Sequence, residues 1–526
     1  MNRRVFYIGL AFFCFVGGIL LSNSIKSKIK SFYHETPLTE KSKEINLNDS
    51  IHDFYLKIKD SDFDRLKLER DLALKESYLP DCLQSYHQAE LKYNNQKFNA
   101  KIALTGGLKE HFNHINKWSF KLKLENGKKI KGMSKFAFIY PKARGYLTDW
   151  VAYKLLKARG GIGLKVGFCD VHINKKYFGL YYIEERFGNH ILKNNGLENG
   201  IIFRMKIALK TENIGTSFNF NTNLKFYNLK NILSDSALKS QLSEIKQLWF
   251  SFYSGTREAK EVFDLKKFAT VFAVSDLMNS KHGYSVHNLR FYYNPTTKLF
   301  EPIGREWMDI DSGPPENKKF GSLTIEGELS ENVQWDNIYL KNLIIETLYK
   351  NVTLQEMYIK ELEVISERKY LDSILKNNDT ELNIYINKIK NYDSTYNFPY
   401  SKLYKNQKSI LQKLYPETPS IKVYYKGFIK NKIELLVINE TNLHQEISEI
   451  KYSNYSFLKS NFIVYPKYMN PEGQKLELKI NEDFSFIDFN KSSLDIIFSC
   501  LGVSPVMTNY LNEKIINMTV VQPQIK

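Results

Sequence analysis

Cysteine is scarce in this chain, and its spacing narrows the classes of protein that fit. Only four cysteines occur among 526 residues, at Cys14, Cys82, Cys169 and Cys500. None belongs to a Cys-x-x-Cys pair or to any metal-binding spacing, so neither a cysteine zinc site nor a disulfide framework is indicated. Extended disorder is not indicated either, because aromatic residues make up 14% of the chain. We expect a globular protein with buried or inert thiols.

Acidic residues are also in deficit, at 57 against 75 Lys and Arg, which leaves a formal net charge of +18. Such a balance fits nucleic-acid binding, attraction to an anionic surface, or a generally lysine-rich exterior. No compact basic tract or nucleic-acid motif is present, so a nucleic-acid partner is not expected. A basic groove would suit ATP and acidic substrates.

Long apolar runs are absent except for one of 18 residues, Val5 to Ser22. Its length lies between a membrane span and the core of a signal peptide, and no small-x-small cleavage site follows it. We predict a signal anchor in residues 1–30 that holds the protein in the membrane with its body outside the cytoplasm. The alternative is a cleaved signal peptide and a secreted protein. Basic residues flank both ends of the run, so charge discriminates little between topologies.

The periodicity of the sequence predicts an α+β fold in two parts after a linker at residues 31–45. Residues 46–415 mix strands with amphipathic helices, which dominate residues 331–415. Residues 416–526 carry short alternating runs separated by polar turns, and these predict a small β-sandwich. We interpret this second part as a binding or spacer module.

Two features near residue 100 could bind phosphate groups. Gly106 and Gly107 would let backbone N–H groups approach a phosphate, although these residues by themselves favour a plain hairpin turn. Lys121 lies in an alternating strand from Lys117 to Leu124, where it could hold phosphates or simply line an exposed basic face. Further on, Thr148 with Asp149 predicts the capped start of a helix.

The segment from His282 to Gly313 is the strongest candidate for chemistry. A His-Gly turn leads to His287 and Asn288, and a predicted β-hairpin separates them from three acids, Glu306, Asp309 and Asp311. Amide and carboxylate oxygens are the ligands that Mg²⁺ prefers. The alternative is a surface hairpin with solvated acids.

These pieces together resemble the spore coat protein H (CotH) kinase family, whose members resemble atypical protein kinases. The resemblance covers about residues 50–410. It is carried by the following segments, in the family's order: Ala103 to Gly107, Lys117 to Leu124, Thr148 to Gly161, the Asn174 hairpin with Gly179, Tyr181 and Glu184, and His282 to Gly313.

The resemblance implies a two-lobe, kinase-like domain that uses ATP and Mg²⁺ to phosphorylate a Ser or Thr hydroxyl of a protein at the cell surface or envelope. The implied sites are as follows: Gly106, Gly107, Lys121 and Glu184 for the nucleotide, Asn288, Asp309 and Asp311 for the metal, and Asp276, His282 and Asn288 for catalysis. Glu184 or its neighbour Glu185 could contact the nucleotide or pair with Lys121.

The sequence departs from the family at two catalytic positions. Many relatives have an Asp just before the asparagine motif, but residues 282–287 contain none, and Asp276 is the nearest acid. Where an aromatic residue and an Asp are expected after Gly304, Arg305 and Glu306 stand instead. An active kinase and a degenerate, pseudokinase-like surface or scaffold protein therefore both remain open, with an unrelated surface protein as the third reading.

Overall fold

The structure, a computed structural model, describes the following residues: 52–205, 224–280, 282–284, 288–308, 343–416, 420–429, 431–452, 455–457, 461–467, 469–479 and 494–501. The predicted signal anchor and linker lie outside this range. Within it, no helix is long and apolar enough to cross a membrane.

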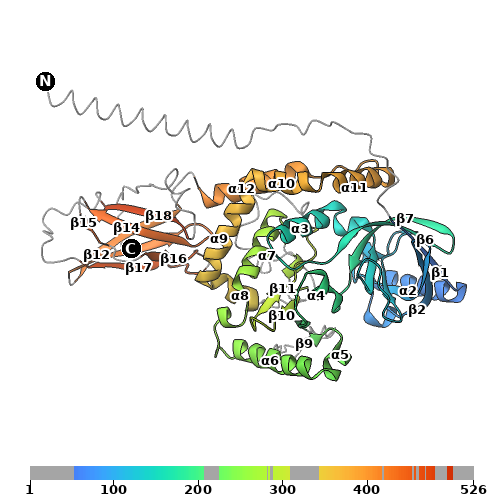
Figure 1. The fold of residues 1–526 in the computed structure, drawn as a ribbon. Helices are drawn as coiled ribbons and strands as arrows, with labels where there is room; N and C mark the ends of the chain where they lie inside the picture. Colours follow the sequence, from blue (N-terminus) through green and yellow to red (C-terminus); the bar gives the residue numbers. More distant parts are fainter. Residues whose placement is uncertain are drawn as a thin grey trace.

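The N-terminal part is a closed, seven-stranded β-barrel in the order β1-β2-β3-β4-β5-β7-β6 (Figure 1). Its strands are β1 (His52–Ile58), β2 (His87–Tyr93), β3 (Gln96–Leu104), β4 (Phe120–Leu124), β5 (Lys135–Ile139), β6 (Val166–Ile173) and β7 (Lys176–Glu185). The parallel pair β1 and β6 closes the barrel, and the other neighbours are antiparallel. Alternation along β4 sends Phe120, Leu122 and Leu124 into the barrel core, where helix α2 (Asp60–Glu76) adds Leu66 and Ala73.

Tight turns set the register of the barrel hairpins. Asn94 and Asn95 both have positive φ, 45° and 60°, and join β2 to β3 as predicted. Asn174 and Lys175, with φ of 47° and 67°, do the same for β6 and β7. Two central residues with positive φ give the primed turn whose twist matches antiparallel strands.

A second core joins the outer face of the barrel to helices and a four-stranded sheet, β11-β10-β8-β9. These strands are β8 (Ile201–Met205), β9 (Leu224–Phe226), β10 (Phe291–Tyr293) and β11 (Phe300–Pro302), and the helices are α3 (Leu147–Ala158), α4 (His190–Asn194), α5 (Leu229–Ser234), α6 (Ser236–Tyr253), α7 (Leu265–Leu277), α8 (Leu343–Lys350) and α9 (Val352–Ser366). Short 3₁₀ turns lie at Asp81–Leu83, Lys109–His111, Pro141–Arg144, Ala259–Glu261 and His282–Tyr284. Asp264 caps α7 by accepting the Lys267 N–H at 3.0 Å, as its sequence predicts.

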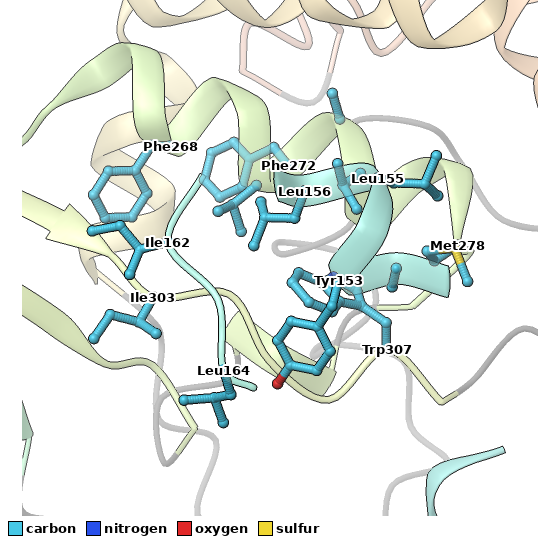
Figure 2. Close-up of a cluster of buried hydrophobic side chains, with 14 of the residues drawn as sticks. Tyr153, Leu155, Leu156, Ile162, Leu164, Phe268, Phe272, Met278, Ile303 and Trp307 are labelled. Atoms are coloured by element: carbon cyan, nitrogen blue, oxygen red, sulfur yellow. The ribbon is translucent and has the colours of Figure 1, made fainter. Parts of the chain in front are cut away.

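Helices α3 and α7 form the centre of this core (Figure 2). The Tyr153 and Trp307 rings meet edge to face at 5.3 Å. The Trp307 indole N–H also donates to Ser275 Oγ of α7 at 2.9 Å. Trp307 therefore fixes the segment that follows β11 against both helices, because its ring packs on α3 and its N–H is hydrogen-bonded to α7.

Three more helices, α10 (Arg368–Asn377), α11 (Asp379–Tyr392) and α12 (Tyr400–Leu414), run along one side of the molecule (Figure 1). Helix α11 reaches back to the barrel, where the Tyr385 and Phe168 ring centroids are 4.8 Å apart. Lys388 Nζ lies 3.3 Å from an Asp170 carboxylate oxygen of β6. Barrel and helices are thus held together at a second place besides α3.

Two small sheets at the C-terminal end share one core, with Ile433 and Leu435 from one sheet and Ile447 and Ile496 from the other. Their order is β12-β13-β17 and β15-β14-β16, with β18 also paired to β14. The strands are β12 (Ile421–Ile429), β13 (Lys432–Asn439), β14 (Gln445–Tyr452), β15 (Tyr455–Ser456), β16 (Phe462–Val464), β17 (Gln474–Lys479) and β18 (Leu494–Cys500). Cys500 and Leu501 pack into the helical core, so these sheets lie against the end of α12. The predicted domain boundary at residue 416 stays a prediction.

Candidate functional site

Glu306 lies at the centre of a buried ion cluster between the barrel and the second sheet. It follows β11 with a φ of 59°. Its carboxylate contacts the Arg305 guanidinium, Arg144 Nη2 at 3.4 Å and His282 Nε2 at 3.3 Å. Burial opposes the charged form, but Arg305, Arg144 and His282 hold the pKa of Glu306 well below its usual value. The carboxylate is therefore ionised, and two guanidinium groups and one imidazole engage it.

Arg144 connects this centre to the barrel. Its Nε donates to Glu184 Oε2, at the end of β7, at 2.8 Å. Burial disfavours the guanidinium charge, but Glu184, Glu306 and Asp149 together raise the pKa of Arg144 well above its usual value. Arg144 thus neutralises carboxylates from two separate parts of the chain, and its loss would leave buried charge uncompensated.

Asp149 lies in the first turn of helix α3, as the sequence predicts. The helix begins after Tyr146, so Thr148 also lies within the first turn and the predicted cap at Thr148 is wrong. The Asp149 carboxylate instead accepts the Trp307 backbone N–H and the Tyr182 hydroxyl, each at 2.8 Å. Burial raises its pKa to about 6. The side chain points inward because the segment after β11 passes over the start of α3.

The His-Gly turn is needed for close packing against the same segment. A Cβ on Gly283 would lie 2.0 Å from the Arg305 carbonyl oxygen, so only glycine fits there. The Asn288 amide donates to the His282 carbonyl oxygen at 3.0 Å, and its Oδ1 is 3.5 Å from Arg305 Nη1. His282 and Asn288, both predicted for catalysis from the same segment, thus meet at Glu306 and Arg305.

Gly106 borders the cluster through His111. It has a φ of +92°, and a Cβ there would lie 2.1 Å from His111 Cγ. His111 Nδ1 lies 3.0 Å from Ser119 Oγ, and burial, with Arg144 as the next cause, lowers its pKa to about 3. Packing of a neutral imidazole therefore explains this glycine, and phosphate binding at Gly106 stays a prediction. A Cβ on Gly107 would lie 3.2 Å from Cε2 of the Tyr78 ring.

Lys121 lies on the same barrel face as Glu184 but does not pair with it. The register places Lys121 opposite Ala137 and Ala137 opposite Glu184, so the two charged residues are two strands apart, about 10 Å. Lys121 Nζ donates to Gln84 Oε1 at 2.7 Å and lies 5.3 Å from the Tyr86 ring centroid. The carboxylate partner expected for Lys121 is held by Arg144 instead.

Asp276 lies among the helices. Its carboxylate accepts a hydrogen bond from the Tyr358 hydroxyl of α9, and it interacts electrostatically with Lys413 of α12. Its neighbour Ser275 is the residue that faces Trp307. The structure therefore brings His282, rather than Asp276, to the ion cluster.

The described side chains do not fit a divalent cation as they are arranged. Both Glu306 oxygens already contact cationic or imidazole groups, and Arg305 approaches the Asn288 oxygen. Within the described residues, no group of three or more His, Cys, Asp or Glu could hold a metal ion. Asp309 and Asp311 lie outside the described residues, so the magnesium site predicted there stays a prediction.

No signal in the sequence marks Arg144 or His111 of this cluster. The sequence marks Arg305 only as a departure from the family pattern, and Glu306 as that departure and as one of three possible metal ligands. No periodicity or motif marks Arg144, because its role depends on barrel and sheet residues that lie 40 and 162 positions away.

Elements far apart in sequence thus converge on one buried set of charges beside a β-barrel, with a glycine turn at one edge and an asparagine loop at the other. The family model described as CotH kinase protein matches residues 106–451, more than half of the chain, and runs into β14. The chain belongs to the CotH kinase family, and this membership implies an ATP-using kinase. A search of curated proteins gives no match.

Proposed function

We propose that this protein is an ATP-dependent kinase that phosphorylates Ser or Thr hydroxyls of a protein substrate at the cell surface. The observation that supports it best is the convergence of the Gly106 turn, Arg144, Glu184 and the segments containing His282 and Glu306. Kinases catalyse mainly by positioning and by neutralising phosphate charge, and this region supplies both a rigid frame and cationic groups.

In this proposal the nucleotide lies along the outer barrel face that carries Lys121, Ala137 and Glu184. Ala103 and Ala137 flank Lys121 in register, and both side chains are buried. Lys121 would contact the phosphates, which would point toward Arg144. The face belongs to the barrel wall, so it is presented by rigid strands rather than by loops.

His282 is the base that the geometry supports. Its Nε2 lies 3.3 Å from the Glu306 carboxylate, and its side chain keeps 30% of its surface exposed. A carboxylate-oriented imidazole can accept the proton of an acceptor hydroxyl. The hydroxyl oxygen then bonds to the γ-phosphorus while the bond to the β-phosphate oxygen breaks and ADP leaves.

The test is transfer of label from γ-labelled ATP by the full-length protein, to itself or to envelope proteins, together with a separate measurement of ATP binding. We expect the protein both to bind ATP and to transfer the label. Both measurements are made with and without added Mg²⁺, and a difference between them would reveal a contribution from Asp309 and Asp311. If the wild type transfers the label and Glu306→Gln does so at the same rate, the proposed site is wrong.

One observation favours a second candidate, a binding or scaffold protein without phosphoryl transfer. Glu306 occupies the position where the family pattern leads one to expect a metal-binding Asp, and here Arg144 and Arg305 both engage it. A carboxylate held this way stabilises the fold without metal. ATP binding without transfer would support this second candidate.

For location, we propose that residues 5–22 anchor the protein with its body outside the cytoplasm. The apolar run supports this, and a secreted form is the alternative. Protease added to intact cells should digest the portion from residue 46 to the C-terminus, while a cytoplasmic control protein survives. A chain that is fully protected until the cells are lysed would refute this location.

A further inference from the structure

Three lysines form a row across neighbouring barrel strands. In the register, Lys101 of β3 lies opposite Lys123 of β4, and Lys123 lies opposite Lys135 of β5. Adjacent strands are about 4.8 Å apart, and like charges placed directly opposite each other destabilise a sheet. The row of three lysines therefore concentrates positive charge at some cost to the stability of the fold.

The row lines two adjoining hollows with volumes of about 690 and 530 Å³. They share Lys123, Ser134 and Lys135, and we call them together the lysine groove. Lys129, Lys230, Asn189, His190, Asn228 and Asn231 also line the larger hollow. No carboxylate is among the described residues that line the larger hollow.

The positive charge of the lysine groove is largely uncompensated within the described residues. Lys135 Nζ donates to a neutral group, Asn228 Oδ1, at 3.0 Å. Burial, followed by the nearby Lys135, lowers the pKa of His190 to about 4, so His190 is neutral at pH 7. Glu125 pairs with Lys101 at 3.5 Å and is the acid at the smaller hollow.

The lysine groove opens beside the proposed nucleotide face. Lys123 and Lys135 are each two residues from Lys121 and Ala137 on the same strands and face, about 7 Å along the sheet. The Arg186 N–H donates to the Lys135 carbonyl oxygen at 3.0 Å, so the chain that leaves Glu184 passes directly along the groove. A segment bound in the groove would place neighbouring residues near the proposed site of transfer.

We propose that the lysine groove docks an acidic segment of the protein substrate, which presents clustered carboxylate or phosphate groups beside the acceptor hydroxyl. This inference rests on the proposed kinase function. A hollow between strands and the Asn228 turn suits side chains of an extended peptide, whereas a membrane surface would need a protruding face. Charge steering would also accelerate encounter with such a substrate.

The test measures fluorescence anisotropy of labelled peptides with the full-length protein. One peptide carries Ser followed by a run of Glu, a second carries phosphoserine in place of Glu, and a third carries Gln. We expect the wild type to bind the first or second peptide in a salt-sensitive way and to bind the Gln peptide at least tenfold more weakly. Comparison of the first two separates carboxylate from phosphate recognition.

Lys123→Glu is the informative variant, because it should weaken peptide binding while stabilising the fold. Placing a carboxylate between Lys101 and Lys135 replaces repulsion with attraction, which should raise Tm by roughly 1–3 °C. Acidic-peptide binding should fall at least about tenfold. The matched control is Lys475→Glu on β17, whose partners Glu434 and Glu477 lie at 2.6 and 3.1 Å. The control should lower Tm and leave peptide binding unchanged.

Binding that is equal in wild type and Lys123→Glu would overturn the inference, and so would groove-dependent binding of duplex DNA or anionic vesicles without peptide binding. ATP transfer is measured separately on the same samples. Phosphoryl transfer without peptide binding would refute the docking role of the lysine groove and leave the proposed kinase function intact. Peptide binding that depends on Lys123, without phosphoryl transfer, would refute the proposed kinase function and leave a binding site for acidic peptides.

Discussion

Arg144→Met is expected to destabilise the fold by about 3–5 kcal/mol, because it removes one partner from a buried ion cluster. Arg144 pairs with Glu184 at 2.8 Å and with Glu306 at 3.4 Å, and their side chains are 9% exposed or less. Removal of the guanidinium leaves Glu184 buried without that partner. Urea unfolding followed by tryptophan fluorescence measures the loss, since Trp307 lies beside the cluster.

The matched control is Lys154→Met on the neighbouring helix α3. Its ion pair with Glu381 is shorter, at 2.7 Å, but its two side chains are 29% and 42% exposed. An exposed pair contributes at most about 1 kcal/mol. The double variant Arg144→Met/Glu184→Gln should recover part of the loss, because the carboxylate left without Arg144 is then neutral. Equal losses for Arg144→Met and Lys154→Met would contradict a stabilising cluster.

The cluster also predicts a direction for acid sensitivity. The pKa of Glu306 in the folded protein lies well below its ordinary value of 4.5. Its contribution to stability is therefore fully present above pH 4.5 and is lost as the pH falls through the folded-state pKa. Glu306→Gln should flatten the pH dependence of stability below pH 4.5.

His282→Gln is expected to lower the rate of phosphoryl transfer by roughly 10²- to 10⁴-fold, the usual contribution of a general base. ATP binding should change little, because His282 contacts Glu306 and not the proposed nucleotide face. Single-turnover transfer from labelled ATP and a separate measurement of ATP binding check the two expectations.

His172→Gln provides a matched control for this variant. His172 also lies beside a carboxylate, with Nε2 3.1 Å from Asp53, but on the barrel at the β1–β6 seam. This substitution should leave the transfer rate within about twofold. If Asp276→Asn abolishes transfer in a folded protein while His282→Gln retains it, the base lies at the end of α7 and the role given to His282 is wrong.

Lys121 and Glu184 show which part of the site could be predicted from the sequence. The alternation along residues 117–124 correctly separates the side chains of the barrel core from those on the face that carries Lys121 and Lys123, because strand periodicity is a local property. The same alternation cannot identify the partner of Glu184. That partner, Arg144, lies after β5 in a 3₁₀ turn, and only the antiparallel pairing of β5 with β7 brings it there.

The lysine groove illustrates the same division. Its lysines are spread over residues 101–230, where the sequence showed only a general excess of positive charge and no compact tract. The register of β3, β4 and β5 aligns three of them. A one-residue shift of β4 would turn Lys123 toward the barrel interior, so the charge row exists only through this pairing.

By itself, the sequence determined the local elements and the family. These are the asparagine turns of the hairpins, the Asp264 cap, the helical pattern predicted for residues 331–415, which the structure describes from residue 343, and the CotH resemblance. Each of these features depends on residues that are neighbours in the chain or on the order of short motifs along it. The tertiary structure alone decided which charges meet. The Arg144–Glu184–Glu306 cluster and the lysine row arise from contacts between distant strands and turns, and such contacts leave no periodic signal in the chain.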